Sequence, residues 1–327
     1  MYTEDGRWSA KWEWNTPIHE FMNYRENHIF VKREDLIPYS FGGNKARKAA
    51  LFFEDLDKSE SDCVLTYGSS HSNHCRIVAN LAAGRRIPCH IIAPVQVSDI
   101  TYNSRLMELF GARIKAVTVE NVSNAIKQEL TEMQTNGLKP YFIPGGGHGN
   151  IGTRAYVQCY REIKEYENEH EIYFDYIFFA SGTGTTQAGL ICGQMLNNDD
   201  RKIIGISIAR KNPRGKDAII SSIREYMALY GDISGWQEKM KSCTIFLDDY
   251  IKGGYGKDDF QLWENIKSIM AQYGIPLDST YTGKAFMGMK DYIERQSLTG
   301  KQILFIHTGG TPLFFDDINQ YFNVPLP

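Results

Sequence analysis

Short apolar runs rich in β-branched residues alternate along this chain with stretches whose apolar residues recur at helical spacing. Such alternation is typical of β-α-β units, whose strands pair in parallel within one sheet. We predict strands at residues 63–66, 89–93, 114–119, 176–179, 203–208 and 303–306. We predict helices at residues 75–83, 102–110, 186–196 and 218–230. The pattern therefore indicates an α/β fold built on parallel sheet.

Length and composition set the broad class of protein. With 327 residues and 42% hydrophobic content, the chain can bury a large core, and its length favours two domains. The formal net charge is -3 and no basic block stands out, so we expect neither nucleic acid nor a membrane as a partner. The apolar runs are far shorter than the ~20 residues of a membrane span. A small polar ligand is the natural partner.

The N-terminus and the cysteines bear on the compartment and on metal binding. Residues 1–6 lack the basic start and apolar stretch of a secretory signal, so we expect a cytoplasmic protein. The chain has 6 scattered cysteines and no C-x-x-C pair, which indicates reduced thiols rather than a disulfide framework. His71, His74 and Cys75 lie close together in the sequence, but their spacing matches no tetrahedral zinc site. We predict no metal.

A Gly-Gly-Asn turn at residues 42–44 places Lys45 at the start of an apparent helix. Glycines let a flat ring approach the backbone, and a lysine held beside that ring can form a Schiff base with an aldehyde cofactor. Pyridoxal phosphate is the obvious candidate. The same residues are also compatible with an ordinary turn followed by a solvated lysine.

Two further turns follow predicted strands and suit anions. Residues 67–74 (YGSSHSNH) offer backbone N-H groups and hydroxyls at a helix start, which suits a carboxylate. Residues 180–189 (ASGTGTTQAG) combine glycines with hydroxyls at another helix start, which suits a dianionic phosphate. Simple N-capping and a plain glycine turn are the structural alternatives.

Glycines also surround two tyrosines, Tyr255 and Tyr281. From their spacing alone, both are packing residues with one satisfied hydroxyl. Residues 144–152 form one more glycine-rich turn. A flexible crossing between domains explains that turn at least as well as a ligand contact, so we predict no site there.

Taken in order, KREDL at 32–36, GGNKARK at 42–48, Ser-Asn-His at 72–74 and the glycine-threonine loop resemble the tryptophan-synthase-β-like, fold-type-II pyridoxal phosphate enzymes. The resemblance is strongest to the branch that contains D-cysteine desulfhydrase and 1-aminocyclopropane-1-carboxylate deaminase. It implies two open twisted parallel-sheet domains, with the smaller (49–157) inserted into the larger (1–48 and 158–327). Cofactor and substrate would lie between the domains. A homodimer is also implied.

The resemblance further implies roles for individual residues. The catalytic residues would be Lys45, which carries the cofactor as a Schiff base, Ser72, Tyr255 and Tyr281. The other cofactor-binding residues would be Asn44, Asn73 at the ring hydroxyl, Gly182, Thr183, Gly184, Thr185 and Thr186 at the phosphate, Thr282 at the ring nitrogen and Thr308 near the ring. The substrate would contact Ser69, Ser72, Asn73 and His74.

Thr282 bears on the reaction. Deaminases of this branch carry Glu at the matching position, and a carboxylate would keep the pyridine nitrogen protonated. A threonine hydroxyl cannot do so, and a neutral ring is a weaker electron sink, which favours loss of a β-substituent over opening of a cyclopropane. We therefore predict β-elimination from a small amino acid. The resemblance suggests D-cysteine, which would give pyruvate, hydrogen sulfide and ammonia.

Other functions stay open. The loop residues TTQAG at 185–189 look more deaminase-like, so a 1-aminocyclopropane-1-carboxylate deaminase that releases 2-oxobutanoate and ammonia is the first alternative. His71 stands where the family commonly has Gln, which leaves substrate choice open. A non-catalytic pyridoxal-phosphate-binding protein is a second alternative. A nucleotide-binding dehydrogenase is disfavoured because no G-x-G-x-x-G motif follows a strand.

Overall fold

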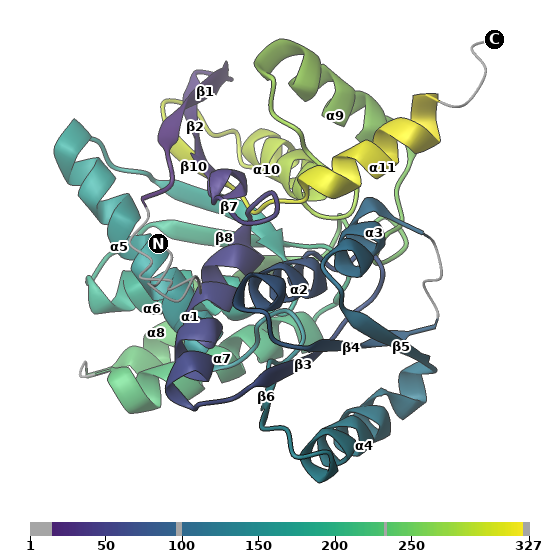
Figure 1. The fold of residues 1–327 in the computed structure, drawn as a ribbon. Helices are drawn as coiled ribbons and strands as arrows, with labels where there is room; N and C mark the ends of the chain where they lie inside the picture. The colour runs from purple at the N-terminus through teal and green to yellow at the C-terminus, as the bar shows by residue number, and fades with distance from the viewer. Residues whose placement is uncertain (1–14, 96–99, 232–233, 323–327) are drawn as a thin grey trace.

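Two sheets organise the computed structural model, which describes residues 15–95, 100–231 and 234–322 (Figure 1). The larger sheet has six strands in the order β1-β2-β10-β7-β8-β9, and the smaller has four in the order β5-β4-β3-β6. All neighbouring strands run parallel except β1 and β2, which form an antiparallel hairpin at one edge. The predicted α/β fold with two parallel sheets is confirmed.

The elements of both sheets follow one another along the chain with short connections. The strands are β1 (Ile18–Tyr24), β2 (Asn27–Arg33), β3 (Cys63–Tyr67), β4 (Cys89–Pro94), β5 (Arg113–Val117), β6 (Pro140–Phe142), β7 (Tyr176–Ser181), β8 (Lys202–Ser207), β9 (Ile245–Leu247) and β10 (Gln302–His307). The helices are α1 (Asn44–Lys58), α2 (Asn73–Arg85), α3 (Tyr102–Leu109), α4 (Val122–Thr135), α5 (Asn150–His170), α6 (Thr185–Leu196), α7 (Arg214–Tyr230), α8 (Trp236–Cys243), α9 (Phe260–Tyr273), α10 (Thr282–Arg295) and α11 (Thr311–Phe322). Two 3-10 turns, η1 (Glu34–Leu36) and η2 (Val119–Asn121), complete the set.

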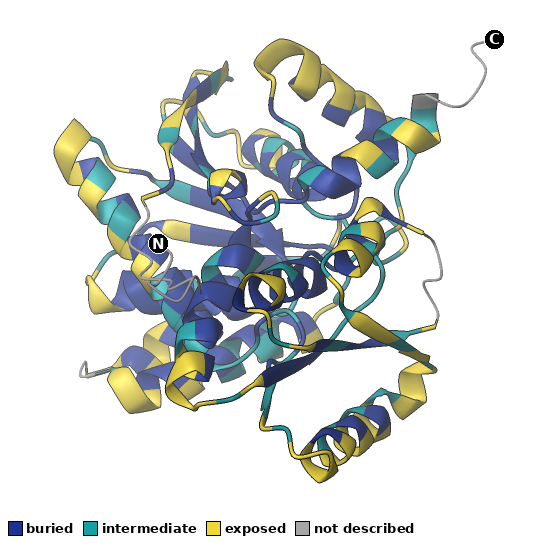
Figure 2. Ribbon diagram, in the orientation of Figure 1, coloured by how far each residue is buried: buried dark blue, intermediate teal, exposed yellow. Residues whose placement is uncertain are grey.

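The six-stranded sheet has helices on both faces. Along β7, Ile177 and Phe179 pack into the core formed with α5, α6, α7 and α8, while Phe178 and Ala180 pack into the core formed with α9 and α10. This alternation is the period of two that a strand imposes on its side chains. Because both faces are covered, the strand reads as a continuous apolar run in the sequence. Figure 2 shows the buried strands at the centre of the molecule.

The four-stranded sheet follows the same rule on a smaller scale. Val64 of β3 packs with α1 and α2, whereas Cys63 and Leu65 pack with α4 on the opposite face. Figure 1 shows α4 on the outer side of this sheet, away from the larger one. Helix α1 contacts both α2 and α5, so it joins the two halves of the molecule. The domain limits 49 and 157 fall inside α1 and α5, and they stay a prediction.

The carboxyl ends of three parallel strands lead into the turns that the sequence singles out. Strand β3 leads into residues 68–72, β7 into residues 182–184, and β10 into residues 308–310. Ligands of open α/β sheets bind at such ends, because the following helices direct their N-termini there. The fold therefore gathers the predicted turns on the sides of the two sheets that face each other.

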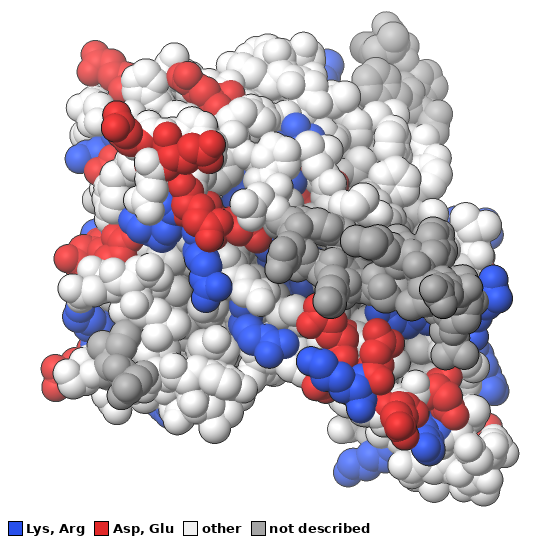
Figure 3. Space-filling view, turned by 60° about the vertical axis from the view of Figure 1, so that its left-hand side comes forward, with Lys and Arg blue, Asp and Glu red and all other residues white. Residues whose placement is uncertain are grey.

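The surface and the helices bear on the predicted partners. Figure 3 shows acidic and basic side chains interspersed over the face that it presents, with no single basic field. Within the described part of the chain, no helix combines the length and the apolar character needed to span a membrane.

Candidate active site

The turn before α1 determines where Lys45 lies. Gly43 has a φ of +102°, and a Cβ on it would lie 2.7 Å from the carbonyl oxygen of Thr308. Only glycine permits this approach without strain. The backbone N-H of Asn44 donates to the same carbonyl at 3.0 Å. These contacts join the predicted Schiff-base lysine to the end of β10, and so to the predicted ring neighbour Thr308.

The amine of Lys45 lies against a second glycine turn. Its Nζ donates to the carbonyl of Gly146 at 3.1 Å. Desolvation by burial, helped by the nearby Arg210 guanidinium, lowers the pKa of Lys45 to about 8. About a tenth of such an amine is unprotonated at pH 7, far more than for an ordinary lysine, and only the unprotonated amine is a nucleophile toward an aldehyde.

The glycine-rich turn at 144–152 belongs to the site, although the sequence interpretation did not place it there. A Cβ on Gly146 would lie 2.7 Å from the Cγ2 of Thr183, and a Cβ on Gly145 would lie 2.7 Å from the ring of Tyr67. The glycines therefore let this turn contact both predicted anion-binding turns. Their density was the only signal in the sequence, and it describes an interdomain crossing equally well.

The glycine-threonine loop connects β7 to α6. Gly184 has a φ of +101°, and a Cβ on it would meet the Cγ1 of Ile219 at 3.0 Å. Helix α6 begins at the next residue, so the first N-H groups of α6 have no partner within the helix and face the loop. Asn44 Nδ2 donates to the hydroxyl of Thr186 at 3.1 Å, which ties this loop to the Lys45 turn.

A second lysine, Lys48, contributes to the same loop and was missed from the sequence. It is fully buried, and its Nζ donates to the hydroxyl of Thr185 at 2.7 Å. Among the described residues it forms no ion pair with a carboxylate, and its other close partner is the ring of Tyr156 at 5.6 Å. A buried cation without a counterion is costly. The available signal was its spacing of three residues from Lys45, which puts both on one face of α1.

Arg210 adds further positive charge here. Its Nη1 donates to the carbonyl of Thr183 at 3.1 Å. Burial, with a contribution from Lys45, lowers the pKa of Lys48 well below its usual value, as expected for cations gathered out of water. Two cations, two hydroxyls and a helix N-terminus thus converge on a loop without side chains at residues 182 and 184. This arrangement suits a phosphate dianion.

The Ser-Asn-His turn both caps a helix and presents donors. Ser72 is the N-cap of α2: its Oγ accepts from the backbone N-H of Cys75 at 3.2 Å, and its side chain also bonds the Cys75 thiol. The Nε2 of His74 lies 2.8 Å from the hydroxyl of Thr66, which donates to the carbonyl of Ile143. His74 therefore donates through Nε2, and its buried Nδ1 has no hydrogen-bond partner among the described residues.

The two predicted tyrosines meet. The hydroxyls of Tyr255 and Tyr281 lie 2.5 Å apart, and the Tyr255 hydroxyl also bonds the side chain of Ser69. Burial raises the pKa of both phenols. The hydrogen bonds of Tyr255 oppose that rise, whereas the contact with Tyr255 raises the pKa of Tyr281 further. Burial therefore favours the protonated form of both phenols.

Thr282 is fully buried at the start of α10, and its hydroxyl is already engaged. Its Oγ1 donates to the Oδ2 of Asp278 at 2.7 Å and accepts from the backbone N-H of Asp278 at 2.8 Å. Burial raises the pKa of Asp278, although three donors from residues 281 and 282 oppose the rise. The sequence did not predict Asp278, because a lone acidic residue four positions before Thr282 carries no motif.

A group of acidic residues lies nearby but is occupied by protein cations. The side chains of Glu34, Cys159 and Glu162 come within 4.8 Å of one another, as metal ligands would. Arg47 pairs with both carboxylates at 2.6 and 2.5 Å, and Lys32 pairs with Glu162 at 2.8 Å. Although burial opposes it, the Arg47 charge holds the pKa of Glu34 at about 2. The cluster is an ion-pair network beside α1.

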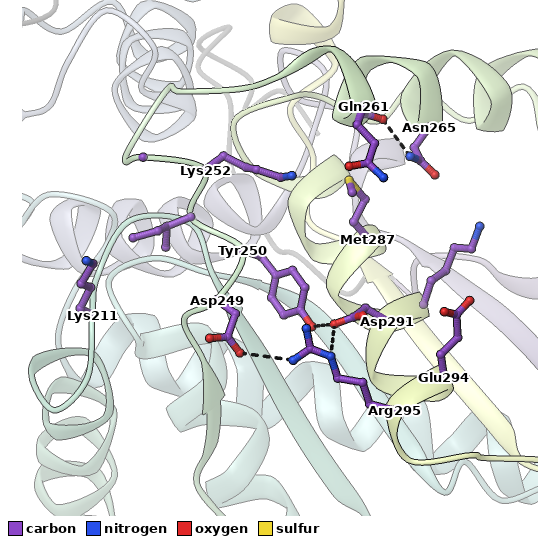
Figure 4. Close-up of a pocket in the computed structure, with 13 residues that line it drawn as sticks. Lys211, Asp249, Tyr250, Lys252, Gln261, Asn265, Met287, Asp291, Glu294 and Arg295 are labelled. Carbon is purple, nitrogen blue, oxygen red and sulfur yellow. Dashed lines mark hydrogen bonds and ion pairs between the residues drawn. The ribbon is translucent and has the colours of Figure 1, made fainter.

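A cavity of about 730 Å³ opens elsewhere, beside the 249–253 loop and α10 (Figure 4). Its charged side chains largely satisfy one another: Arg295 pairs with Asp291 at 2.8 Å, and Tyr250 bonds Asp291 as well. None of the predicted site residues lines it. The candidate active site is the group of turns around Lys45, not this cavity.

Comparison with known proteins agrees with this geometry. The family model described as "Pyridoxal-phosphate dependent enzyme" matches residues 10–309. A protein of Pyrococcus furiosus, provisionally named 1-aminocyclopropane-1-carboxylate deaminase, is 32% identical over 304 residues, which cover 91% of this chain and 90% of that protein.

Solved structures share the fold. A crystal structure of an ACC deaminase homologue superposes with a TM-score of 0.81 at 30% identity, covering 94% of this chain and 93% of its own. A hydrogen sulfide-producing enzyme of Fusobacterium nucleatum superposes with a TM-score of 0.66 at 20% identity, covering 91% of this chain and 95% of its own. At that identity the second likeness concerns the fold alone.

Proposed function

This chain belongs to the family of pyridoxal-phosphate dependent enzymes, and from that premise we propose that it deaminates a small amino acid through a cofactor bound covalently to Lys45. The observation that carries the proposal is the placement of Lys45. Its amine, whose pKa is lowered to about 8, donates to Gly146 beside the loop that Lys48 contacts, and its charge also acts on His74 of the Ser-Asn-His turn.

The residues fit the cofactor. Lys48 is a buried cation that lacks a carboxylate partner among the described residues, and it bonds a hydroxyl of the loop that would hold the phosphate. The loop that contains Gly182 and Gly184 leads directly into α6, whose first N-H groups would bind that phosphate. Asn73, Thr282 and Thr308 would surround the ring. When bound, pyridoxal phosphate supplies an electron sink for the bond that breaks at the substrate Cα.

The protein groups would supply binding and proton transfer. Ser69 and Ser72 would hold the substrate carboxylate with the backbone N-H groups of the 69–73 turn, which precedes the start of α2. His74 would contribute an acceptor through its unpartnered Nδ1. Lys45 would take the Cα proton, and Tyr255 with Tyr281 would pass a proton to or from the leaving group.

We propose β-elimination as the reaction, with D-cysteine as substrate: one water is consumed, and pyruvate, hydrogen sulfide and ammonia form in equal amounts. The test is to incubate the purified protein with D-cysteine, L-cysteine and D-serine and to measure sulfide, pyruvate and ammonia. Release of the three products in equal amounts from D-cysteine, and none from a Lys45→Ala variant, is expected. Activity that persists in that variant would exclude Lys45 as the attachment point.

A second candidate is the opening of 1-aminocyclopropane-1-carboxylate to 2-oxobutanoate and ammonia. Two observations favour it: the Pyrococcus furiosus relative carries that name, and the buried carboxylate of Asp278 lies directly behind Thr282. Formation of 2-oxobutanoate in the same assay, without sulfide from cysteine, would select this reaction. The visible band of bound cofactor with no spectral change on any amino acid would instead indicate a non-catalytic binder.

The proposal includes a homodimer in the cytoplasm. All 6 cysteines are free in the structure, as is usual for proteins kept in a reducing compartment. Light scattering of the purified protein measures the assembly, and a mass near twice 37.3 kDa is expected.

A further inference from the structure

Arg76, on α2, is a buried cation that the chemistry described so far does not use. The whole residue is 0% exposed. Its guanidinium donates to the Oγ of Ser40 and to the Oδ1 of Asn73, both at 3.2 Å, and its Nε has no partner. Among the described residues it forms no ion pair. By contrast, the similarly buried Arg201 pairs with Glu167 at 2.6 Å and Asp199 at 2.6 Å.

An unpaired buried guanidinium is costly unless an anion approaches it. Burial lowers the pKa of Arg76 to about 9, in keeping with the absence of a carboxylate. The phosphate dianion does not explain Arg76, because the loop that would hold it already has Lys48 and Arg210. Among the described residues, Tyr281 is close enough to Arg76 to act on its pKa, so the guanidinium lies toward the tyrosine end of the site. We therefore infer that a second anion, other than the phosphate, offsets the cost of burying the Arg76 guanidinium.

Asn73 connects Arg76 to the site. Its Oδ1 accepts from Arg76 Nη2 at 3.2 Å and from Asn103 Nδ2 at 3.0 Å. Two donors on this oxygen fix the orientation of the amide and leave its NH2 group to donate elsewhere. Asn103 also donates to the carbonyl of His71 at 3.1 Å, which holds the amide against the same turn. The positive charge of Arg76 therefore polarises a donor that begins α2.

We propose that Arg76, acting through Asn73, is the positioning residue of a second oxyanion seat in the active site. By this seat we mean the position beside the Asn73 NH2 group where a negatively charged oxygen would bind. The inference rests on the proposed function, which supplies two candidate oxyanions: the ring oxygen of pyridoxal phosphate and the carboxylate of the amino acid. Either oxyanion would accept a hydrogen bond from the Asn73 NH2 group. Arg76 would stabilise the negative charge of that oxyanion without contacting it. Arg76 thus orients the Asn73 amide and also places a positive charge near the bound group.

The test compares Arg76→Met and Arg76→Gln, which remove the charge, with Arg76→Lys, which keeps it. Arg85→Met is the matched control, because Arg85 lies on the same helix but pairs with Asp57 at 3.0 Å. The first readout is the pH midpoint of the visible absorption of bound pyridoxal phosphate. The second is the ratio of dissociation constants for D-alaninol and D-alanine, which differ in the carboxylate.

If the ring oxygen occupies the seat, loss of the charge raises the pH midpoint by about one unit, because a nearby cation favours the anionic oxygen. If the substrate carboxylate occupies it, D-alanine binding weakens about tenfold while D-alaninol binding is unchanged. Arg76→Lys and Arg85→Met stay near wild type in both cases. The proposal would be overturned if Arg76→Met and Arg76→Gln fold but keep the wild-type pH midpoint of absorption and the wild-type ratio of the two dissociation constants. A wild-type protein that takes up no pyridoxal phosphate would instead overturn the proposed function.

Discussion

The hydroxyl of Thr282 donates to the Oδ2 of Asp278 at 2.7 Å, so its single proton is not available to a ligand. A further lone pair of the oxygen can only accept. Opposite a pyridine nitrogen, such a hydroxyl would favour the protonated ring, with the Asp278 carboxylate behind it. This contact weakens the argument that Thr282 leaves the ring neutral, and it makes cyclopropane opening a stronger candidate than the sequence suggests.

Asp278→Asn is predicted to lower kcat for deamination by roughly tenfold or more. The three hydrogen bonds donated to the Asp278 carboxylate favour its charged form, and that charge would favour ring protonation. The effect should be larger for 1-aminocyclopropane-1-carboxylate than for D-cysteine, since ring opening depends more on the electron sink. Steady-state kinetics on both compounds measure it. Asp317→Asn is the control: burial, mainly, raises the pKa of Asp317 to about 8, so that side chain is already largely neutral at pH 7. Equal losses of kcat in the two variants would contradict a specific effect of Asp278, through Thr282, on the protonation of the ring.

Lys48→Met is predicted to have opposite effects on the empty and the loaded protein. Without cofactor, removal of a buried unpaired cation should raise Tm. With cofactor, loss of a charged hydrogen bond, worth ~2 kcal/mol, should weaken pyridoxal phosphate binding about 30-fold. Thermal unfolding of the cofactor-free protein and a fluorescence titration measure the two quantities. A fall in Tm without a change in affinity would mean that Lys48 is a packing residue.

The pKa of Lys45 predicts a pH dependence for cofactor attachment. Only the unprotonated amine attacks the aldehyde, so the attachment rate should rise about tenfold per pH unit up to pH 8 and then level off. The lowered pKa also means that the unfolded chain binds this proton more tightly, so the cofactor-free protein should gain stability between pH 8 and pH 10.5. Borohydride trapping followed by peptide mass spectrometry gives both rate and site. A tag on Lys48 instead would contradict the assignment.

Much of the fold could be predicted from the sequence because it depends on local patterns. Every predicted strand and helix coincides with an observed element, since apolar runs between turn residues identify fully buried parallel strands. Strands β6 and β9 were missed because three residues are too few to show a period. The β1-β2 hairpin was not predicted either.

The residues of the candidate site likewise fall into two groups, those that belong to a sequence motif and those that do not. Residues carried by a motif, such as Lys45 and Thr186, could be named in advance, and the structure brings their turns together. Lys48, Arg76 and Asp278 could not, because their importance lies in what surrounds them. An unpaired buried cation or a hydroxyl bound by a carboxylate is a property of packing, and no local pattern in one sequence records it.

The tyrosine pair allows a ranking that the sequence left open. Besides its contact with Tyr281, the Tyr255 hydroxyl bonds the side chain of Ser69, a residue of the turn that would hold the substrate carboxylate. Tyr255 should therefore move the proton, and Tyr281 should orient it across their 2.5 Å contact. Tyr255→Phe is predicted to reduce kcat by about 100-fold or more, the scale of one lost proton-transfer group. Tyr281→Phe should reduce kcat by less than Tyr255→Phe does. It should also raise the pH at which kcat reaches half its maximum, because Tyr255 loses its hydrogen bond to the Tyr281 hydroxyl. If both variants lose kcat equally and keep the wild-type pH dependence, the two phenols contribute by packing and neither transfers the proton.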